Sequence, residues 1–579
     1  MKLIVGNQPV AIPWDATITL ERLSPALNEK VGSFSYPFTV PTAPNQRILG
    51  WPGKLERVGD IPDKSFILED SGIQVLRGTL EYDEVSEEDI GIILKSGSSE
   101  FYSNVNDDSP DTGGSMLSSL DLGREDWFDG KVVTIEQFID KLTSWDTSNR
   151  TPDSPYVVAP FQLAYPTMPS ILGNKHTSQG YLFQTTWLED TFDFFMLQFK
   201  AWYILERIFQ HYGYSVIIDE LKTGQFRDLV IFSRPFAVTA TEVDFEVYPD
   251  ALLNDRMIFP IVPYLTYAHL MPQVKTIDFL TEIKALMGLT FDIDDLNKTV
   301  RIIQLKSIIS STENAVELTE LVGWSHKETP RSSSSSPEGY SFSFTEQQDP
   351  LDNRTDYIVG ATFANYSEMP AASINGYLVH ITSVDHDYIT VQRDDDFFWE
   401  RIGRLKPKEF GQKKTKLEFN VLISTLDAPH YDHIYEGPKI HLVNTYEMPE
   451  DQYFDMGFTM YEMPKIFVSL YRGTVKNTLI TTIPFQWDPM PLLSADQWIL
   501  SETLWLSPAR IYELIYADFL SWQTSNPRQF KKYLQITLPE LLALQWGKRY
   551  FISGVRVLLS KITYDLPFTG MVRVEGYVA

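Results

Sequence analysis

The chain has 579 residues, 43% of them hydrophobic, and a formal net charge of 49 − 77 = −28. This length exceeds what one hydrophobic core usually holds, so several domains are expected, and the ordinary hydrophobic fraction argues against disorder. The acidic balance argues against nucleic-acid binding by broad charge attraction, because phosphates would be repelled. An acidic surface that keeps the protein soluble is the simpler interpretation, although the total charge says nothing about a local basic patch.

Other features of the composition exclude further classes. There is no cysteine, so neither disulfides nor thiolate chemistry is available. The apolar run at the start covers only Leu3 to Val5, whereas a secretory signal needs about 7–15 apolar residues. The richest apolar window, residues 191–209, contains four charged residues, whereas a membrane helix needs about 20 largely uncharged ones. We therefore expect no signal peptide, no membrane span and synthesis in a cytoplasm.

The composition of the whole chain favours strands and turns. Its 29 Tyr and 35 Phe are typical of strands, and its 35 Pro and 31 Gly are typical of turns. Residues 1–110 are predicted to form an N-terminal β domain with a hairpin whose turn is Ser86–Glu88. Residues 111–185 are rich in turn-forming residues and are predicted to be an irregular connector.

Residues 186–315 contain two similar stretches, in which a helix, a glycine and a strand follow one another. In the first, Leu205 and Ile208 lie on one helical face and Gly213 is the expected stop. In the second, Thr276 can cap the helix and Gly288 ends it. Aligned on the glycines, the two stripes match, which predicts two α+β modules of like topology with positive φ at both glycines. Because helix–glycine–strand is a common arrangement, coincidence is the alternative to a true duplication.

The last two segments complete the predicted fold. Residues 316–500 begin with a serine-rich linker and then contain strand-like runs, so a β-rich middle domain is expected. Residues 501–579 are predicted to form a C-terminal α+β or barrel module, in which Ser507 caps a helix and Gly554 makes a tight turn. The predicted fold class is mainly β and multidomain, with small β-barrels or sandwiches and helix–glycine–strand α+β units.

The motifs of common catalytic and phosphate-binding sites are missing. The sequence has no nucleophile elbow, no phosphate-cradling glycine loop, no dinucleotide fingerprint and no zinc-protease motif. Residues 292–297, "DIDDLN", resemble a calcium loop but lack its sixth-position glycine and its twelfth-position glutamate, so a hairpin turn is favoured. No residue is therefore predicted to be catalytic, cofactor-binding or metal-ligating.

Two clusters of charged residues offer alternatives to that conclusion. The first offers imidazole and carboxylate groups that can hold zinc, but in a spacing that matches no known frame; its members are Asp427, His430, Asp432, His433 and His441. The second, Arg393–Glu400, places three carboxylates beside aromatic residues, as at sugar-binding surfaces, but an exposed loop is the simpler interpretation. A pair of carboxylates for glycoside hydrolysis leaves no trace in sequence, because its spacing is set in space.

Three stretches together carry a resemblance to a known family: Leu20–Arg57, Ile204–Val216 and Leu504–Tyr564. The first contains Ser-Tyr-Pro at 35–37, a Pro-to-Asn spacing at 41–45 and Gly-Trp-Pro at 50–52. The last contains Leu-Pro at 538–539 and Lys-Ile at 561–562. In these patterns the chain resembles tail proteins encoded by phages and prophages of gut Bacteroidales. The resemblance spans about half of the chain, and residues 316–500 lie outside it.

The resemblance implies a structural role in a virion. A hub or baseplate protein at the tip of a phage tail would form a homo-oligomeric ring, contact tail-tube, tape-measure and other distal tail proteins, and let DNA pass. It would carry no catalytic site, need no cofactor and bind no nucleic acid sequence-specifically. The residues themselves leave two alternative functions open. One is a glycan- or receptor-binding tail protein, suggested by the aromatic content and the 393–400 cluster, and the other is a tail-associated cell-wall hydrolase.

Overall fold

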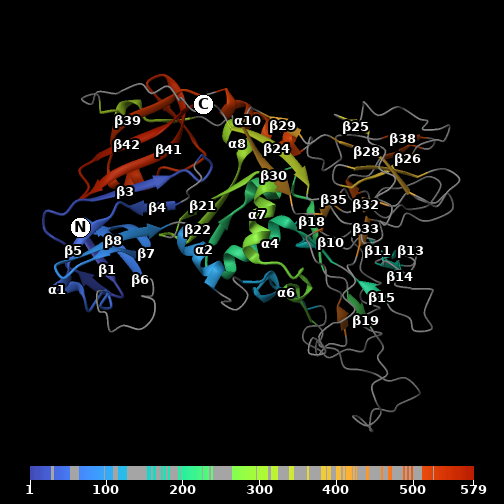
Figure 1. The fold of residues 1–579 in the computed structure, drawn as a ribbon, viewed down its shortest axis with the longest axis horizontal. Helices are drawn as coiled ribbons and strands as arrows, with labels where there is room; N and C mark the ends of the chain where they lie inside the picture. The colour runs from blue at the N-terminus through green and yellow to red at the C-terminus, as the bar shows by residue number, and fades with distance from the viewer. Residues whose placement is uncertain are drawn as a thin grey trace, which may run out of the picture.

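A computed structural model describes the fold (Figure 1). The residues described are 1–27, 32–52, 64–96, 98–107, 115–126, 153–157, 193–195, 197–224, 226–233, 236–238, 264–294, 296–310, 315–323, 511–525 and 527–579, with short strands between 161 and 182 and between 338 and 499. The chain is mainly β with interspersed helices, as the sequence predicts, and its strands form several sheets. No sheet in the described ranges closes into a barrel.

The largest sheet has 13 strands, all of which except β23 come from the two ends of the chain. The first part of its path comprises β2 (Gln8–Val10), β1 (Lys2–Val5), β6 (Lys64–Asp70), β7 (Ile73–Val85), β8 (Asp89–Ser96), β4 (Gly32–Ser35) and β3 (Ile18–Leu23). The path continues through β41 (Val555–Leu566), β40 (Arg549–Ile552) and β23 (Val316–Glu317), with β5 (Phe38–Pro41), β42 (Met571–Val578) and β39 (Gln529–Gln535) branching from it.

The two ends of the chain meet where β3 pairs antiparallel with β41, from Ile18 opposite Leu566 to Leu23 opposite Lys561. Figure 1 shows the blue N-terminal strands and the red C-terminal strands side by side. One hydrophobic core, including Leu20, Ile562 and Val572, lies under both. The predicted N-terminal and C-terminal domains therefore share a sheet and a core, while the domain boundaries themselves stay a prediction.

A second core surrounds the helices in the centre of the molecule, of which α4 and α7 are green in Figure 1. Its main helices are α2 (Ser98–Asp107), α4 (Ala201–His211), α7 (Thr276–Met287), the π-helix η8 (Tyr512–Tyr516) and α10 (Ala517–Thr524). The shorter helices are α1 (Thr42–Asn45), η1 (Leu117–Ser119), α5 (Asp219–Thr223), α6 (Tyr267–Leu270), α8 (Leu305–Ser310), η3 (Thr319–Leu321) and α11 (Leu538–Leu542). No helix within the described ranges has the length and apolarity to cross a membrane.

The helix stops of the repeated stretch are confirmed. Gly213 has a φ of 81° and Gly288 a φ of 58°. After α4, the amide of Tyr214 donates to the Phe209 carbonyl at 3.0 Å, and that of Gly213 donates to the Gln210 carbonyl at 2.9 Å. This pair of bonds satisfies carbonyls that the end of a helix would otherwise leave without donors, and it requires the left-handed backbone that glycine adopts without strain.

The assembly of the two units differs from the two modules of like topology that the sequence predicts. β17 (Ser215–Ile217) follows α4, while β21 (Leu289–Asp294) and β22 (Thr299–Gln304) follow α7. All three form one sheet, with β22 parallel to β17 and antiparallel to β21. The strand after the first unit, β18 (Leu229–Phe232), pairs instead with other strands. The strand β17 alone and the β21–β22 hairpin alone would each leave an apolar face exposed. When they form one sheet, the sheet packs against both α4 and α7.

Several local predictions are confirmed and one is wrong. The β7–β8 hairpin turns at Ser86–Glu88, β21 and β22 form a hairpin that turns between Asp294 and Thr299, and Ser553 and Gly554 turn between β40 and β41 with positive φ. Thr276 does not cap α7: Lys275 is the N-cap residue, and the buried Thr276 hydroxyl accepts from Ser115 Oγ at 3.1 Å. The expected Ser507 cap lies outside the described residues.

The remaining strands belong to smaller sheets of the connector and the middle of the chain. The predicted β-rich middle contains β24 (Glu338–Phe344), β26 (His380–Asp385), β27 (Tyr388–Gln392), β28 (Trp399–Leu405), β30 (Lys413–Phe419) and β33 (Pro438–His441). Three strands from this region pair with strands far away in the sequence: β33 with β11 (Phe161–Ala164), β34 (Phe458–Met460) with β19 (Phe236–Val238), and β35 (Phe467–Tyr471) with β18. The middle region is therefore tied to the central part of the chain by backbone pairing.

Candidate functional site

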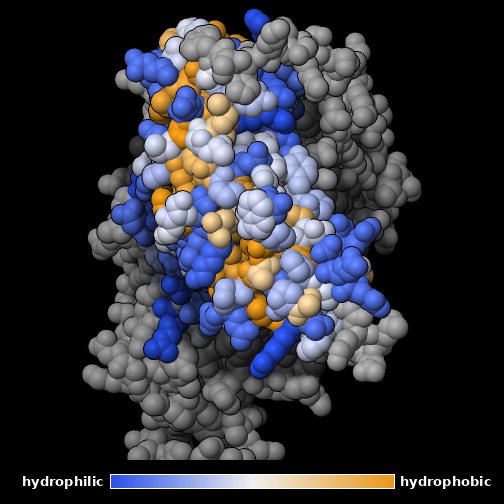
Figure 2. Space-filling model, turned by 90° about the vertical axis from the view of Figure 1, so that its left-hand side faces the viewer, coloured by the Kyte–Doolittle hydropathy of each residue, from blue (hydrophilic) through white to orange (hydrophobic). Residues whose placement is uncertain are grey.

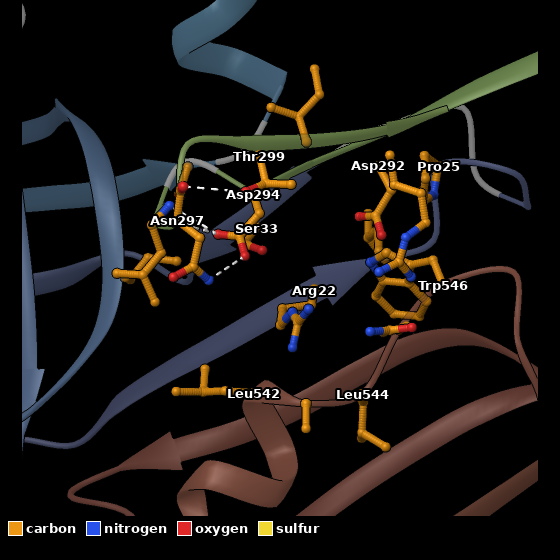
Figure 3. Close-up of a pocket in the computed structure, with 18 of the residues that line it drawn as sticks. Arg22, Pro25, Ser33, Asp292, Asp294, Asn297, Thr299, Leu542, Leu544 and Trp546 are labelled. Atoms are coloured by element: carbon orange, nitrogen blue, oxygen red, sulfur yellow. Dashed lines mark hydrogen bonds between the residues drawn. The ribbon is translucent and has the colours of Figure 1, made fainter. Parts of the chain in front are cut away.

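A cavity of about 380 Å³ lies where the large sheet, the β21–β22 hairpin and the segment after α11 meet (Figure 3). Its volume is in the lower part of the range of sites that hold small ligands, which is about 300–1,000 Å³. In Figure 3, Asp292 and Trp546 lie together on one side, and Asp294, Asn297 and Thr299 lie on the other. Residues far apart in the sequence therefore build one polar cavity between the two cores.

Arg22 enters the cavity from β3. Its Nη1 donates to the Leu541 carbonyl at 3.3 Å, and its guanidinium lies 5.7 Å from the centroid of the Trp546 ring. A cation over an indole face is attracted by the ring quadrupole, and a guanidinium stacks especially well. Trp546 is itself buried, so it holds Arg22 in place and offers little free surface to a ligand.

Asp292 and Arg301 face the cavity as a cross-strand pair. They are opposite one another in the β21–β22 register, and both are partly buried. Within the described part of the chain, neither forms an ion pair or a side-chain hydrogen bond. Burial raises the pKa of Asp292 to about 6; Arg22 and Arg301 oppose this shift, and Asp294 adds to it. Burial prevails because the guanidinium groups lie near the carboxyl without pairing with it.

Asp294, by contrast, is committed to the hairpin turn. One of its oxygens accepts from the amides of Leu296 and Asn297, at 2.9 and 3.1 Å, and the other accepts from Asn297 Nδ2 at 2.7 Å. This is the bonding by which an aspartate at the start of a turn replaces backbone partners. The turn explains the calcium-like appearance of residues 292–297, as the sequence analysis favours.

The cavity contains polar groups but no catalytic constellation. Its lining contains two guanidinium groups, of Arg22 and Arg301, and two carboxyl groups, of Asp292 and Asp294. Across the residues the structure describes, no three His, Asp or Glu side chains form a group that could hold a metal ion. The charged and polar side chains of the lining can hold a polar ligand in the cavity.

The candidate metal cluster at 427–441 and the acidic–aromatic cluster at 393–400 lie largely outside the described residues. Asp427, His430, Asp432 and His433 are not described, and of His441 only its place at the end of β33 is. Of the 393–400 cluster, only Trp399 and Glu400 are described, at the start of β28. No sequence pattern predicts a site at Arg22, Arg301 or Trp546. Arg22 lies in β3 beside the charged Glu21, so the sequence of the strand gives no local signal that singles out Arg22.

The motif residues of the family resemblance converge on the joint between the two ends of the chain. Tyr36 Oη donates to Glu21 Oε2 at 2.7 Å, and the same oxygen pairs with the Lys561 ammonium. The hydrogen bond to Glu21 is the main cause that raises the pKa of Tyr36. Ser35 Oγ accepts from the amide of Leu94 at 2.8 Å. These contacts connect β3, β4, β8 and β41.

Asn45, at the end of the Pro-to-Asn spacing, is fully buried. Its side chain accepts from the Ala11 amide at 2.7 Å and donates to the carbonyls of Ala11 and Pro41, at 2.8 and 2.9 Å. Gly50 and Trp51 both have positive φ, where the chain turns back after α1. The motifs thus fix backbone geometry rather than form a chemical site.

Comparisons with known proteins identify no family. No family model matches the chain, and no curated protein matches it. Among solved structures it is similar to the 43 kDa tail protein of prophage MuSo2 from Shewanella oneidensis, at 10% identity and a TM-score of 0.30, over 100% of this chain and 97% of that one. Likeness at this level does not define a common fold, so we draw nothing from it.

Proposed function

We propose that this protein is a structural component of a phage tail, and more specifically a hub or baseplate subunit at the tail tip. The observation that carries the proposal is the convergence of the motif residues that resemble Bacteroidales phage tail proteins. Tyr36, Asn45 and Lys561 make buried or partly buried contacts that hold distant segments together. These contacts fix the backbone of the two joined ends, which is consistent with the structural role that the resemblance implies.

An exposed tryptophan supports a role in assembly. Trp14 is 96% exposed, and tryptophan is enriched among the residues that dominate protein–protein binding. Its loop is ordered on both sides, by the bonds of Asn45 to Ala11 and by the amide of Ala16, which donates to the Pro13 carbonyl at 3.1 Å. A side chain presented on a rigid loop loses little entropy on binding.

The end of the molecule formed by the large sheet has a mixed surface. Figure 2 shows apolar side chains gathered in a band among hydrophilic ones on this face. Exposed apolar residues of the large sheet and its loops include Trp14, Tyr36, Trp51, Val85, Val316 and Val555. Contiguous apolar surface with a polar surround is typical of contacts between subunits.

In this proposal, several copies form a closed ring that contacts tail-tube, tape-measure and other distal tail proteins. Closed symmetry is the usual arrangement of identical subunits. The net charge of −28 per chain would repel DNA from the lumen if acidic residues line it, and would serve solubility if they lie outside. For the glycan-binding and hydrolase alternatives, no observation among the described residues speaks in favour.

The proposal is tested on purified full-length protein by negative-stain electron microscopy and by light scattering after size-exclusion chromatography. Closed rings of uniform size are the expected result. A protein that is monomeric in solution and also in the virion would contradict the ring. A glycan array and a peptidoglycan-hydrolysis assay are expected to be negative, and turnover that disappears on Asp395→Asn would favour the hydrolase instead.

A further inference from the structure

The charged groups around the cavity are incompletely paired. Arg22 uses one donor on the Leu541 carbonyl, and Arg301 has no ion pair or side-chain hydrogen bond within the described ranges. A guanidinium carries five N–H donors in a planar fork that matches a carboxylate or phosphate. The cavity of about 380 Å³ thus contains several unused donors beside an accessible space.

The lining has two carboxyl groups and two guanidinium groups, but in the part of the chain that the structure describes neither carboxyl group forms an ion pair with a guanidinium group. Asp294 directs both oxygens to the donors of its own turn. Asp292 faces the guanidinium groups without pairing, and burial holds its pKa near 6. In its protonated form Asp292 is a hydrogen-bond donor, so the cavity then presents two cations and a neutral donor.

We propose that this cavity binds an oxyanion, a carboxylate or phosphate group, held between the guanidinium groups of Arg22 and Arg301. Charge-assisted bonds to a planar oxyanion satisfy donors that the protein leaves free. Asp292, at the edge of the same space, donates its proton to the bound oxyanion when protonated and repels it when ionised.

Two sources of the oxyanion fit this chemistry. One is a free small anion. The other is an acidic side chain from a second copy of the chain, since β7 and β8 line the cavity at one end and carry the exposed Glu87 and Glu88 at the other. Opposite ends of one hairpin would then meet head to tail. The site does not depend on the proposed tail function, because it rests on the lining residues alone.

The coupling to pH follows from the groups that face Asp292. These are Arg22 on β3, Arg301 on β22 and Asp294 on β21, and the buried Tyr550 of β40 stays neutral because burial raises its pKa. A bound anion favours the protonated carboxyl, so binding takes up a proton near neutral pH. Affinity is therefore expected to rise as the pH falls from 8 towards 5.5, by about tenfold or more for a fully coupled proton.

The experiment titrates full-length protein with inorganic phosphate and with acetate by isothermal calorimetry, in two buffers of different ionisation enthalpy. Saturable binding with proton uptake is expected in the native protein. Arg301→Gln should lose about tenfold or more in affinity, and Asp292→Asn should bind without proton uptake. Arg77→Gln is the matched control, because Arg77 is exposed on β7 and does not line the cavity. Arg301→Lys, which keeps the charge, serves if Arg301→Gln does not fold.

Self-association of the protein distinguishes the two sources of the oxyanion. If a second copy supplies it, the concentration-dependent association is lost in Glu87→Gln/Glu88→Gln, is lost in Arg301→Gln, and is competed by acetate. If the source is a free anion, the same variants associate as the native protein does, and only Arg301→Gln loses anion binding. The proposal is overturned if neither anion binds saturably and Arg301→Gln leaves association unchanged. If the ring persists in all variants, the result is consistent with the proposed tail function and shows that a second copy of the chain does not supply the oxyanion.

Discussion

Glu21 on β3 and Lys561 on β41 form an ion pair that joins the two ends of the chain. The Glu21 side chain is 6% exposed and that of Lys561 is 23% exposed, and Tyr36 adds a hydrogen bond to the same carboxylate oxygen. The contact lies inside the β3–β41 pairing, so the sheet that contains both termini depends on a charged group taken almost wholly out of water.

Glu21→Gln should destabilise the protein, because it leaves the Lys561 ammonium partly buried without a counter-charge. Removing one partner of a buried pair costs about 3–5 kcal/mol, and the partial exposure of Lys561 reduces this to about 2 kcal/mol. Chemical denaturation measures the change. Asp565→Asn, which alters the exposed Thr19–Asp565 hydrogen bond across the same two strands, should cost less than about 1 kcal/mol. Equal losses in both variants would argue against the buried pair.

Gly288 is constrained twice, by its backbone and by its neighbour. Its φ is 58°, and a Cβ added there would lie 2.1 Å from Ile515 Cγ2. Gly288→Ala should therefore cost backbone strain of about 1 kcal/mol and a further 1–3 kcal/mol or so of overpacking.

Gly213→Ala is the matched control for that substitution. Gly213 has a φ of 81° with no atom within 4 Å of an added Cβ, so only the strain of about 1 kcal/mol applies. Ile515→Ala costs stability on its own because Ile515 is buried. If the contact with Ile515 matters, the loss in the double variant Gly288→Ala/Ile515→Ala should be smaller than the sum of the two single losses. Equal costs for the two glycines would show that the contact with Ile515 is unimportant.

The buried carboxyl of Asp292 should make stability depend on pH. Its pKa is raised from 3.8 to about 6 in the folded protein, so the folded state binds more protons than the unfolded state between these values. Stability therefore falls as the pH rises from about 4 to 6, by at most about 3 kcal/mol, and stays lower above that. Asp292→Asn should remove this slope and raise the melting temperature at pH 8 relative to the native protein. Asp83→Asn, at an exposed position of β7, should leave the profile unchanged.

Asn45→Ala should loosen the N-terminal part of the large sheet. The substitution leaves the Ala11 amide and two carbonyls without their partners in a fully buried place. Unsatisfied buried groups cost about 1–3 kcal/mol each, and relaxation of the loop limits the total to about 3 kcal/mol. Gln46→Ala, at the adjacent partly exposed position, should change the free energy of unfolding by less than about 0.5 kcal/mol.

Trp14→Ala should weaken assembly without weakening the fold. Because Trp14 is 96% exposed, its removal takes no contact from the core, and the melting temperature of the subunit should stay within error. Loss of a tryptophan anchor costs about 2 kcal/mol or more of binding, which shifts the ring–monomer equilibrium at least about 30-fold. Analytical ultracentrifugation reads this shift. An unchanged equilibrium would exclude Trp14 from the interface.

Local features of the fold could be predicted from the sequence. The sequence predicts the helical stripe of Leu205 and Ile208 and the helix stops at Gly213 and Gly288. It also predicts the turns at Ser86–Glu88 and Gly554. Each depends on interactions within a few residues, because a helical face, a left-handed stop and a tight turn are determined by neighbouring side chains and by backbone sterics.

Only the tertiary structure decided which of these elements meet. Three contacts join residues that are separated by long stretches of chain. They are the pairing of β3 with β41, the single sheet of β17, β21 and β22, and the approach of Ile515 to Gly288. The cavity belongs to the same class, since Arg22, Asp292 and Trp546 come from three segments that no local pattern connects. Strand pairing and burial are chosen by the free energy of the whole core, in which many registers compete, whereas a turn is chosen by its own few residues.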